Sequence, residues 1–471
     1  MNGIHLNTRP NVDSQLRPTH ATLVCCTLLA VHLSAWLCGA ADPLASTAGA
    51  ADLKVGTAAA DLQGDDSMVI AGGIHPRYVK GQEGKLRAVA VVLEKPGAVK
   101  LALVACDVLM MTRDQLDPVV QRIEQTCGIP ASHGMIHCPH THHAPTTCRV
   151  HGYDRDEVFS KRVQEGIFEA VRQANADLSE ATLSFKQGEE ETVGQNSRQL
   201  LSDGKIYWTG PRDDAVRPTG PFDPELPVLA FRDPAGGLRA LLFNHSTHTI
   251  GALSGNFRSP AFYGLVAQQL EAELGGTVAF LEGASGSTHR LDVSTGDAVV
   301  RIKQAVLDAL AQAESREVER LAALKRPFSF KVRTFDEAAE DQAVAEYCNK
   351  RLGKRAQSVI DVFRQMRGEL TPHQGEKRTT WIQVLLIGDV AIVGVPAEFF
   401  TQLGMDIKRR SPFEHTYVAE LSNDWIGYLG NREAYDLGGY QLWMGLHSYA
   451  EPGTGERLVE AAVEMLNRLA R

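Results

Sequence analysis

Concentrated positive charge is missing from this sequence. Its 471 residues include 48 lysines and arginines against 57 acids, which leaves a formal net charge of −9. The basic residues are interspersed with acids, and basic runs are no longer than short clusters such as Lys408-Arg409-Arg410. Because nucleic-acid binding needs a dense positive face, we expect no nucleic-acid partner.

Two motifs of other protein classes are missing as well. No Cys-x-x-Cys pair occurs among the eight cysteines, and the Gly-x-Ser-x-Gly elbow of serine hydrolases does not occur. No internal sequence repeat is apparent. Export would permit one or two disulfides, but the sequence fixes no pairing. The cysteines beyond the N-terminal segment are Cys106, Cys127, Cys138, Cys148 and Cys348.

Long apolar runs are confined to the N-terminus. Arg9 and Arg17 precede an apolar run over residues 21–40, and small residues follow it at 39–41. This is the order of a secretory signal, although a run of this length could also anchor the chain in a bilayer. We therefore expect residues 1–41 to be a signal peptide or an N-terminal anchor. The protein would then be exported, either periplasmic or secreted, or held at the membrane by this segment.

The rest of the chain has the pattern of an α/β protein. Residues 42–66 are rich in Ala, Gly and Asp and are interpreted as a linker. From 67 to 471, short valine-rich runs alternate with longer helical stretches, which predicts a single domain with a large mixed β-sheet core flanked by helices. The expected strands are residues 87–93, 101–106, 134–138, 182–185, 228–231, 240–243, 277–281, 380–387 and 390–395. The expected helices are residues 112–126, 156–175, 261–274 and 455–469, with a mostly helical section over 297–365.

Histidine is concentrated where one of these strands ends. Four of the sixteen histidines fall within residues 137–143, directly after the expected strand 134–138. Alternate residues of an extended segment point the same way, so His140 and His142 share a face. One of them could bind a metal while the other faces a substrate. A histidine-rich surface loop is the alternative, but such a loop would not need Pro139 and Pro145 on both sides of a rigid His-Thr-His.

Two further segments could complete a metal site. His245 and His248 follow the expected strand 240–243, and Glu398 follows the strand 390–395 among apolar residues. Zinc usually takes three or four such ligands. On spacing alone, a single histidine is often a hydrogen-bonded core residue. Glu398 could equally be a glutamate that stabilises a helix dipole.

Taken in order, these segments resemble a known family. Neutral/alkaline non-lysosomal ceramidases carry an HTH followed by a small residue and proline, then an NxxxH segment, a PxEF segment and a GY…YxxxxY region. The corresponding segments here are residues 140–145, 244–248, 396–399 and 427–440. The chain is therefore similar to the N-terminal catalytic domain of that family, from about residue 70 to the C-terminus. It resembles a divergent bacterial-type member without the C-terminal immunoglobulin-like domain of larger ceramidases.

The resemblance implies a zinc-dependent amide hydrolase. Its zinc would be held by His140, His248, Glu398 and Tyr435, with His248 preferred to His245 by register. His142 would lie beside the metal, suited to protonate the leaving nitrogen, and Arg198 would be the active-site arginine. Zinc lowers the pKa of bound water towards about 7. The substrate would be a small-molecule or lipid amide such as ceramide, which could also bring the protein to a membrane surface.

Two departures from the family leave a second hypothesis open. The family's GDVSPN segment corresponds to residues 283–290, where its essential serine falls on His289, which we count as an extra site residue. A family tyrosine about a dozen residues after Tyr435 has no counterpart in residues 444–447. The chain could therefore be an exported non-catalytic or binding protein that keeps the fold and the metal site. A serine esterase using Ser285 or Ser287 has no base to support it.

Overall fold

The structure is a computed structural model that describes residues 53–471, apart from 96 and 98. The expected signal peptide or anchor, residues 1–41, lies outside the described residues. The described residues all belong to one compact unit, Ala50–Arg471, which is the second of two units in the chain.

The valine-rich runs form strands that are buried on both faces. The first seven residues of β2 (Arg87–Lys95) and all of β17 (Val390–Gly394) are buried. Strands with near-continuous apolar runs lie between two covering layers, and these strands belong to mixed sheets. The predicted α/β class with mixed sheets and flanking helices is confirmed.

Three larger sheets, rather than one, form within the described residues. Each contains four strands that lie side by side in the order in which the chain forms them. Neighbours among the first three strands are antiparallel, and the fourth strand is parallel to the third. Their orders are β4-β3-β2-β1, extended by β5; β12-β11-β10-β6, extended by β14; and β19-β17-β16-β15. The bounds are β1 Lys54–Asp61, β3 Val99–Cys106, β4 Gly134–His137, β5 Ser179–Glu180, β6 Thr182–Glu189, β10 Glu225–Arg232, β11 Leu238–His245, β12 Thr277–Glu282, β14 Glu314–Arg316, β15 Leu321–Lys331, β16 Lys377–Ile387 and β19 His415–Ala419.

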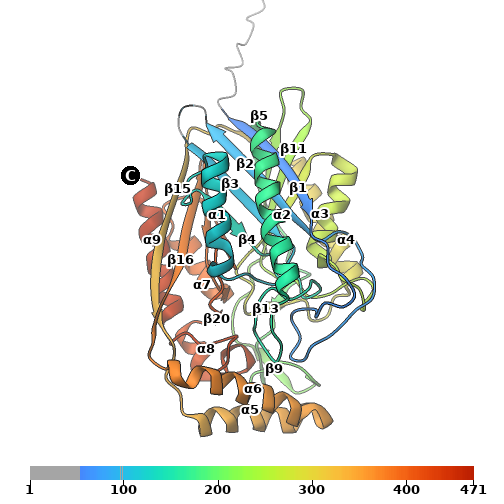
Figure 1. Ribbon diagram of the computed structural model, residues 1–471, viewed down its shortest axis with the longest axis vertical. Helices are drawn as coiled ribbons and strands as arrows, with labels where there is room; N and C mark the ends of the chain where they lie inside the picture. The colour runs from blue at the N-terminus through green and yellow to red at the C-terminus, as the bar shows by residue number, and fades with distance from the viewer. Residues whose placement is uncertain (1–52, 96, 98) are drawn as a thin grey trace, which may run out of the picture. The chain divides into compact units, whose positions relative to one another are not determined.

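Each sheet carries two helices in equivalent places. One helix connects the third strand to the fourth, and another follows the fourth strand; α1 and α2 cover one face of the first sheet in this way (Figure 1). The helices cover the outer faces, and the inner faces of all three sheets share one apolar core. The topology therefore repeats three times, although no sequence repeat is apparent. The pairs are α1 Arg113–Cys127 with α2 Glu157–Ala176, α3 Ala261–Leu274 with α4 Thr295–Ala311, and α7 Thr401–Arg410 with α9 Thr454–Leu469.

Two expected segments are corrected. Residues 54–61, inside the expected linker, form β1, which pairs with β2 along its whole length. Its small side chains hid a strand because valine and isoleucine are the usual signal. Residues 321–331, inside the expected helical section, form β15. This strand lies at the edge of its sheet, where its charges and Pro327 are tolerated.

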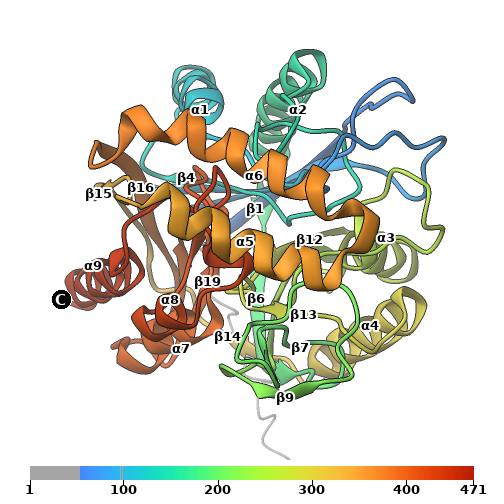
Figure 2. The same cartoon turned by 90° about the horizontal axis from the view of Figure 1, so that it is seen from below.

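The remaining elements lie around the strand ends. Helices α5 and α6 lie side by side (Figures 1 and 2), and they pack against Trp443 and the half-buried Tyr440. The bounds are α5 Glu337–Arg351, α6 Ala356–Leu370, α8 Arg432–Leu437, β7 Gln195–Asn196, β8 Gln199–Leu201, β9 Ala215–Pro218, β13 Thr288–His289, β18 Glu398–Phe399 and β20 Tyr428–Leu429, with single 3-10 turns at Gly353–Arg355, Thr371–His373 and Tyr440–Leu442.

Two chemical features of the described residues bear on the expectations. The five cysteines between residues 53 and 471 are all buried free thiols, so none of them forms a disulfide. Among the helices of this part of the chain, none combines the length and the apolar character that a membrane crossing requires.

Candidate metal centre

Strand ends from all three sheets supply the candidate ligands. His140 follows β4 of the first sheet, His248 follows β11 of the second, and Glu398 follows β17 of the third. Each strand carries its residue to the carboxyl end of its sheet, which is where α/β folds place their ligand sites. His140 has φ 61°, a left-handed backbone that is uncommon outside glycine and typical of strained functional positions.

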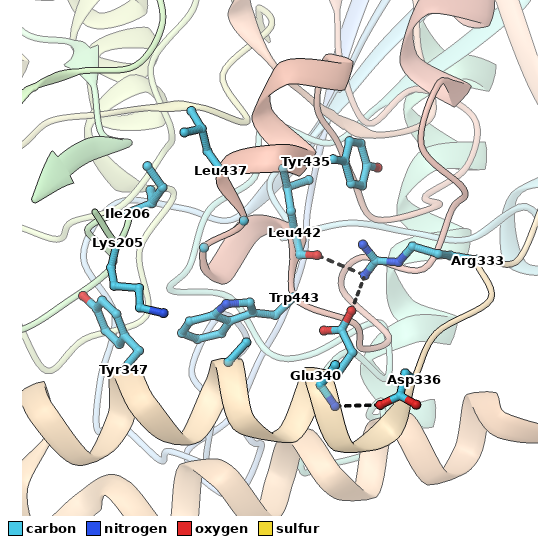
Figure 3. Close-up of a pocket in the computed structure, with 14 residues that line it drawn as sticks. Lys205, Ile206, Arg333, Asp336, Glu340, Tyr347, Tyr435, Leu437, Leu442 and Trp443 are labelled. Atoms are coloured by element: carbon cyan, nitrogen blue, oxygen red, sulfur yellow. Dashed lines mark hydrogen bonds and ion pairs between the residues drawn. The ribbon is translucent and has the colours of Figure 1, made fainter. Parts of the chain in front are cut away.

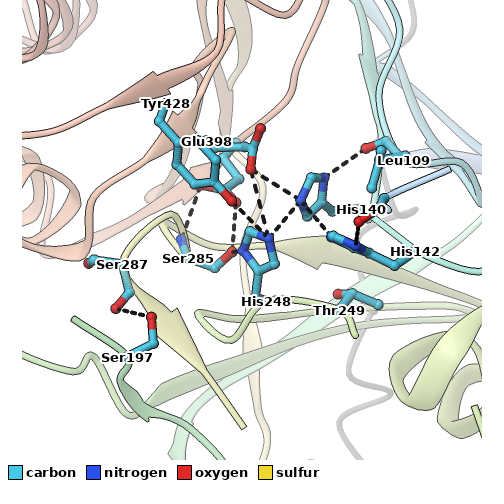
Figure 4. Close-up of polar contacts among 12 residues, drawn as sticks. Leu109, His140, His142, Ser197, His248, Thr249, Ser285, Ser287, Glu398 and Tyr428 are labelled. Carbon is cyan, nitrogen blue, oxygen red and sulfur yellow. Dashed lines mark hydrogen bonds and ion pairs between the residues drawn. The ribbon is translucent and has the colours of Figure 1, made fainter. Parts of the chain in front are cut away.

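The three side chains converge on one point (Figure 4). The Nε2 atoms of His140 and His248 are 2.9 Å apart. Glu398 Oε2 lies 3.4 Å from His140 Nε2 and 3.8 Å from His248 Nε2. The other oxygen of Glu398 accepts a hydrogen bond from Trp425 Nε1 at 3.1 Å, which fixes the carboxylate. The three residues predicted to share a metal therefore lie together.

His142 joins the same point. Its Nε2 lies 3.2 Å from His140 Nε2, and the imidazoles of residues 140, 142 and 248 together can hold a metal ion. The resemblance implied a place beside the metal, either behind the ligands or facing the substrate. The structure aims Nε2 of His142 at the other candidate ligands.

Hydrogen bonds to the opposite ring nitrogens test whether these residues fit a cation. His140 Nδ1 lies 2.9 Å from the carbonyl oxygen of Leu109, and His142 Nδ1 lies 3.3 Å from that of Gly72. A carbonyl oxygen only accepts, so each Nδ1 carries the ring proton and each Nε2 presents a lone pair. Lone pairs that face one another at 3.2 Å, beside a carboxylate, repel unless a cation lies between them. The residues present therefore fit a divalent metal ion.

Burial favours the uncharged rings that metal binding needs. Burial and the neighbouring His140 hold the pKa of His142 and of His248 well below its usual range. The exposed fraction is 1% for His140 and His248, 2% for Glu398 and 4% for Tyr428. His142 and His289 are only partly buried, so the cluster meets solvent on their side.

Tyr435 is replaced in this cluster by Tyr428. Strand β18 pairs with β20 so that Glu398 lies directly beside Tyr428, whose hydroxyl is 3.3 Å from His248 Nε2. Burial and the charge of Glu398 raise the pKa of Tyr428 well above its usual value. Tyr435 instead lines a separate cavity, with its ring against Arg333 (Figure 3). The prediction that Tyr435 joins His140, His248 and Glu398 is therefore wrong.

Arg198 is also placed elsewhere. Its buried guanidinium donates to Gln441 Oε1 at 3.0 Å and to the carbonyl oxygens of Ala434 and Gly438 at 3.2 and 2.6 Å. Burial lowers its pKa to about 9. With these bonds made to the end of α8, Arg198 supports the segment that leads to Tyr440. Among the described residues, the guanidinium of Arg198 hydrogen-bonds to this segment and not to the metal cluster.

His289 does lie beside the cluster. Its ring stacks on that of His248 with centroids 4.4 Å apart, and its Nε2 is shielded with no hydrogen-bond partner among the described residues. Burial lowers its pKa to about 4, so the ring is neutral near pH 7. His245 is excluded as a ligand because Tyr263 and the carbonyl of Glu190 engage its two nitrogens.

Tyr440 lies near Tyr428, with ring centroids 6.1 Å apart. The Tyr440 hydroxyl lies 3.2 Å from Nε2 of His151, whose Nδ1 lies 3.0 Å from the Gly73 carbonyl oxygen. His151 must therefore donate to Gly73 and accept the proton of Tyr440. Trp208 stacks on the same tyrosine ring with centroids 4.4 Å apart.

Sequence patterns could have revealed more of the site. Glu282 and Glu420 are completely buried near His248. Glu282 ends an apolar strand and Glu420 directly follows one, so both have the kind of position that made Glu398 a candidate. Tyr428 lies in the GY pair of the motif that suggested Tyr435, and only strand pairing distinguishes the two tyrosines.

The fold and the site together define an α/β protein with a buried histidine–carboxylate cluster suited to a metal ion. No protein-family model matches the chain, and no curated protein matches it in sequence. Among solved structures, it is similar to neutral ceramidase from Pseudomonas aeruginosa, with a TM-score of 0.68 and 19% identity over 88% of this chain and 74% of that one. A structure described as ceramidase complexed with C2 gives a TM-score of 0.68 and 18% identity over 89% and 75%. The chain thus has the neutral ceramidase fold in a divergent sequence, as the sequence resemblance predicted.

Proposed function

We propose that the protein is a zinc-dependent hydrolase of N-acyl amides, with an N-acyl lipid such as ceramide as the substrate class. The observation that carries the proposal is the convergence of three imidazole nitrogens on one carboxylate, where His140 and His142 present lone pairs rather than protons. A donor set of histidine nitrogens and a carboxylate suits zinc. The ceramidase fold supports amide cleavage as the reaction.

The metal would be held by His140, His142, His248 and Glu398, with Tyr428 against it. When bound, zinc supplies a water of lowered pKa and polarises a carbonyl group. The backbone carbonyls of Leu109 and Gly72 orient the imidazoles that hold it. His289 is neutral and has an unengaged Nε2, so it would take up the proton released by the attacking water and deliver it to the leaving nitrogen. Tyr440, fixed by His151 and next to Tyr428, would orient the acyl group.

Localisation follows from the N-terminal segment in this proposal. The charged, apolar and small-residue order over residues 1–41 supports export. An exported lipid amidase would meet its substrate at a membrane surface, and the metal cluster would open there on the side of His142 and His289.

The proposal is tested on purified protein by measuring bound metal and by screening N-acyl lipids and simple acyl amides. Hydrolysis that is lost on chelation, restored by zinc and absent in His248→Ala supports it. Activity that survives complete removal of the metal would contradict it. Bound zinc without hydrolysis of any amide would favour the alternative of an exported binding protein, for which the loss of the family serine at His289 is the supporting observation.

A further inference from the structure

The fourth strands of the three sheets end in residues that contact one another. His137 ends β4, Glu282 ends β12, and Glu420 directly follows β19. All three are completely buried. With Ser285, which follows β12 by three residues, they form a group that we call the strand-end hub.

His137, at the end of the first sheet's fourth strand, hydrogen-bonds to residues at the strand ends of the other two sheets. Its Nδ1 lies 2.6 Å from the carbonyl oxygen of Glu420, and its Nε2 accepts the backbone N–H of Glu282 at 2.8 Å. One nitrogen must donate and the other accept, so a single neutral tautomer satisfies both contacts. Burial lowers the pKa of His137 to about 3, which keeps that neutral form.

Ser285 connects the two carboxylates to the metal cluster. Its Oγ lies 2.7 Å from Glu282 Oε1, 2.7 Å from Glu420 Oε1 and 3.4 Å from Nδ1 of His248. This is the ring nitrogen opposite the one that faces the other candidate ligands. The hub therefore touches His248 from the side away from the metal cluster.

Glu420 reaches a second candidate ligand through the backbone. Its Oε2 accepts the N–H groups of Ser285 at 3.0 Å and of Phe399 at 2.8 Å. Phe399 is the neighbour of Glu398, and both belong to β18. One buried carboxylate thus fixes the loop beside His248 and the strand that carries Glu398.

The charge of the hub also favours a cation nearby. Two carboxylates without exposed surface are costly unless positive charge compensates them. Neither Glu282 nor Glu420 forms an ion pair with a lysine or arginine of residues 53–471. The group next to them is His248, and a metal ion held by His248 and its neighbours would supply such a charge.

We infer that Glu282, Ser285, Glu420 and His137 are positioning residues for the metal centre, which set the orientation of His248 and the place of Glu398. This inference rests on the metal site of the proposed function. Partners of this kind orient imidazole ligands, and their loss typically weakens metal affinity about 10- to 100-fold. Glu420 has the largest role because it acts on two ligands.

The test measures metal affinity rather than activity. The full chain and its variants Ser285→Ala and Glu420→Gln are titrated with zinc against a competing chelator. Cobalt-substituted samples are compared by visible absorption, which reports coordination geometry. Ser287→Ala is the matched control, because Ser287 is a buried serine of the same loop whose hydroxyl contacts Thr401 instead. We expect affinity about 10- to 100-fold weaker and an altered cobalt spectrum in both hub variants, with Ser287→Ala unchanged.

Several outcomes would overturn the inference. One is equal zinc affinity and an unchanged cobalt spectrum in Ser285→Ala and Glu420→Gln. Another is a second zinc per chain that Glu420→Gln removes, because the hub would then be a metal site itself. If Glu420→Gln does not fold, Ser285→Ala, which loses a single oxygen atom, decides. Weakened affinity in a protein that hydrolyses no amide would support the hub and contradict only the proposed function. A wild-type chain that binds no zinc would contradict both.

Discussion

The backbone of His140 is left-handed, with φ 61°, and this conformation costs a non-glycine residue about 1–2 kcal/mol. The same conformation turns the imidazole toward His248 and lets its Nδ1 meet the Leu109 carbonyl. We expect His140→Gly to be more stable than His140→Ala by about 1 kcal/mol in the presence of a chelator, because glycine removes the strain. Both variants should lose metal binding. Equal unfolding free energies in urea would show that the strain is absent.

The two tyrosines offer a direct comparison at the same scale. Tyr428 contacts His248, whereas Tyr435 lies against Arg333 in another cavity. We expect Tyr428→Phe to lower zinc affinity and amide hydrolysis at least about tenfold, and Tyr435→Phe to leave both unchanged. Chelator competition and initial rates measure the two effects. If Tyr435→Phe lowered zinc affinity and hydrolysis while Tyr428→Phe left both unchanged, Tyr435 would be the ligand.

The pH dependence of stability should be traceable to His151. Burial, followed by the charge of His447, lowers its pKa to about 3, while the unfolded chain titrates near pH 6.5. Below about pH 6.5 the unfolded state binds a proton that the folded state excludes, so this residue costs stability as the pH falls toward 3. At pH 5 the cost is about 2 kcal/mol. Between pH 7.5 and pH 5.0, the unfolding free energy measured in urea should fall less in His151→Gln than in the wild type, by about 2 kcal/mol. An equal fall in both proteins would contradict the assignment of this pH dependence to His151.

At the scale of elements, the pairing of β18 with β20 depends on Gly427. Its φ is 85°, and a Cβ there would lie 2.6 Å from the His447 carbonyl oxygen. Gly427→Ala should therefore destabilise the fold by at least about 1–2 kcal/mol and displace Tyr428 from Glu398. The control is Gly368→Ala in α6, where a Cβ meets nothing and stability should rise by about 0.5–1 kcal/mol. The prediction is checked by measuring thermal unfolding and zinc affinity of both variants. Equal effects of Gly427→Ala and Gly368→Ala would contradict it.

Elements with strong local patterns could be predicted from the sequence, and those set by long-range contacts could not. The strand-end positions of His140, His248 and Glu398 made them candidates, the family resemblance selected them, and the structure brings them together. Helix α1 ends at Gly128 as its pattern indicates. β1 was missed because alanine and glycine carry little strand signal. Tyr428 was missed because a short motif does not show the register of β18 on β20. The contacts of Arg198 likewise depend on the distant segment 434–441.

The three sheets of the described residues meet at the carboxyl ends of their strands, so each sheet gives at least one candidate ligand and at least one hub residue. The topology repeats while the sequence does not. Each of the three sheets therefore has a residue at the same strand end, but the residue type differs from sheet to sheet. His137, Glu282 and Glu420 occupy such positions and bond to one another. The site therefore belongs to no single sheet, and the binding energy of a metal would act on the junction of all three.

This junction makes metal binding a stabiliser of the whole second unit. A cation that binds only the folded chain stabilises it by about 4 kcal/mol at a free concentration about a thousand times its Kd. For a unit of this size that corresponds to a shift in Tm of about 5 °C. We expect chelation to lower Tm by about this amount, zinc to restore it, and His248→Ala to have the lower Tm under both conditions. Because the ligands come from three sheets, the transition should shift as a single step in calorimetry. A chelator effect confined to a separate early transition would mean that the cation holds together only a local segment.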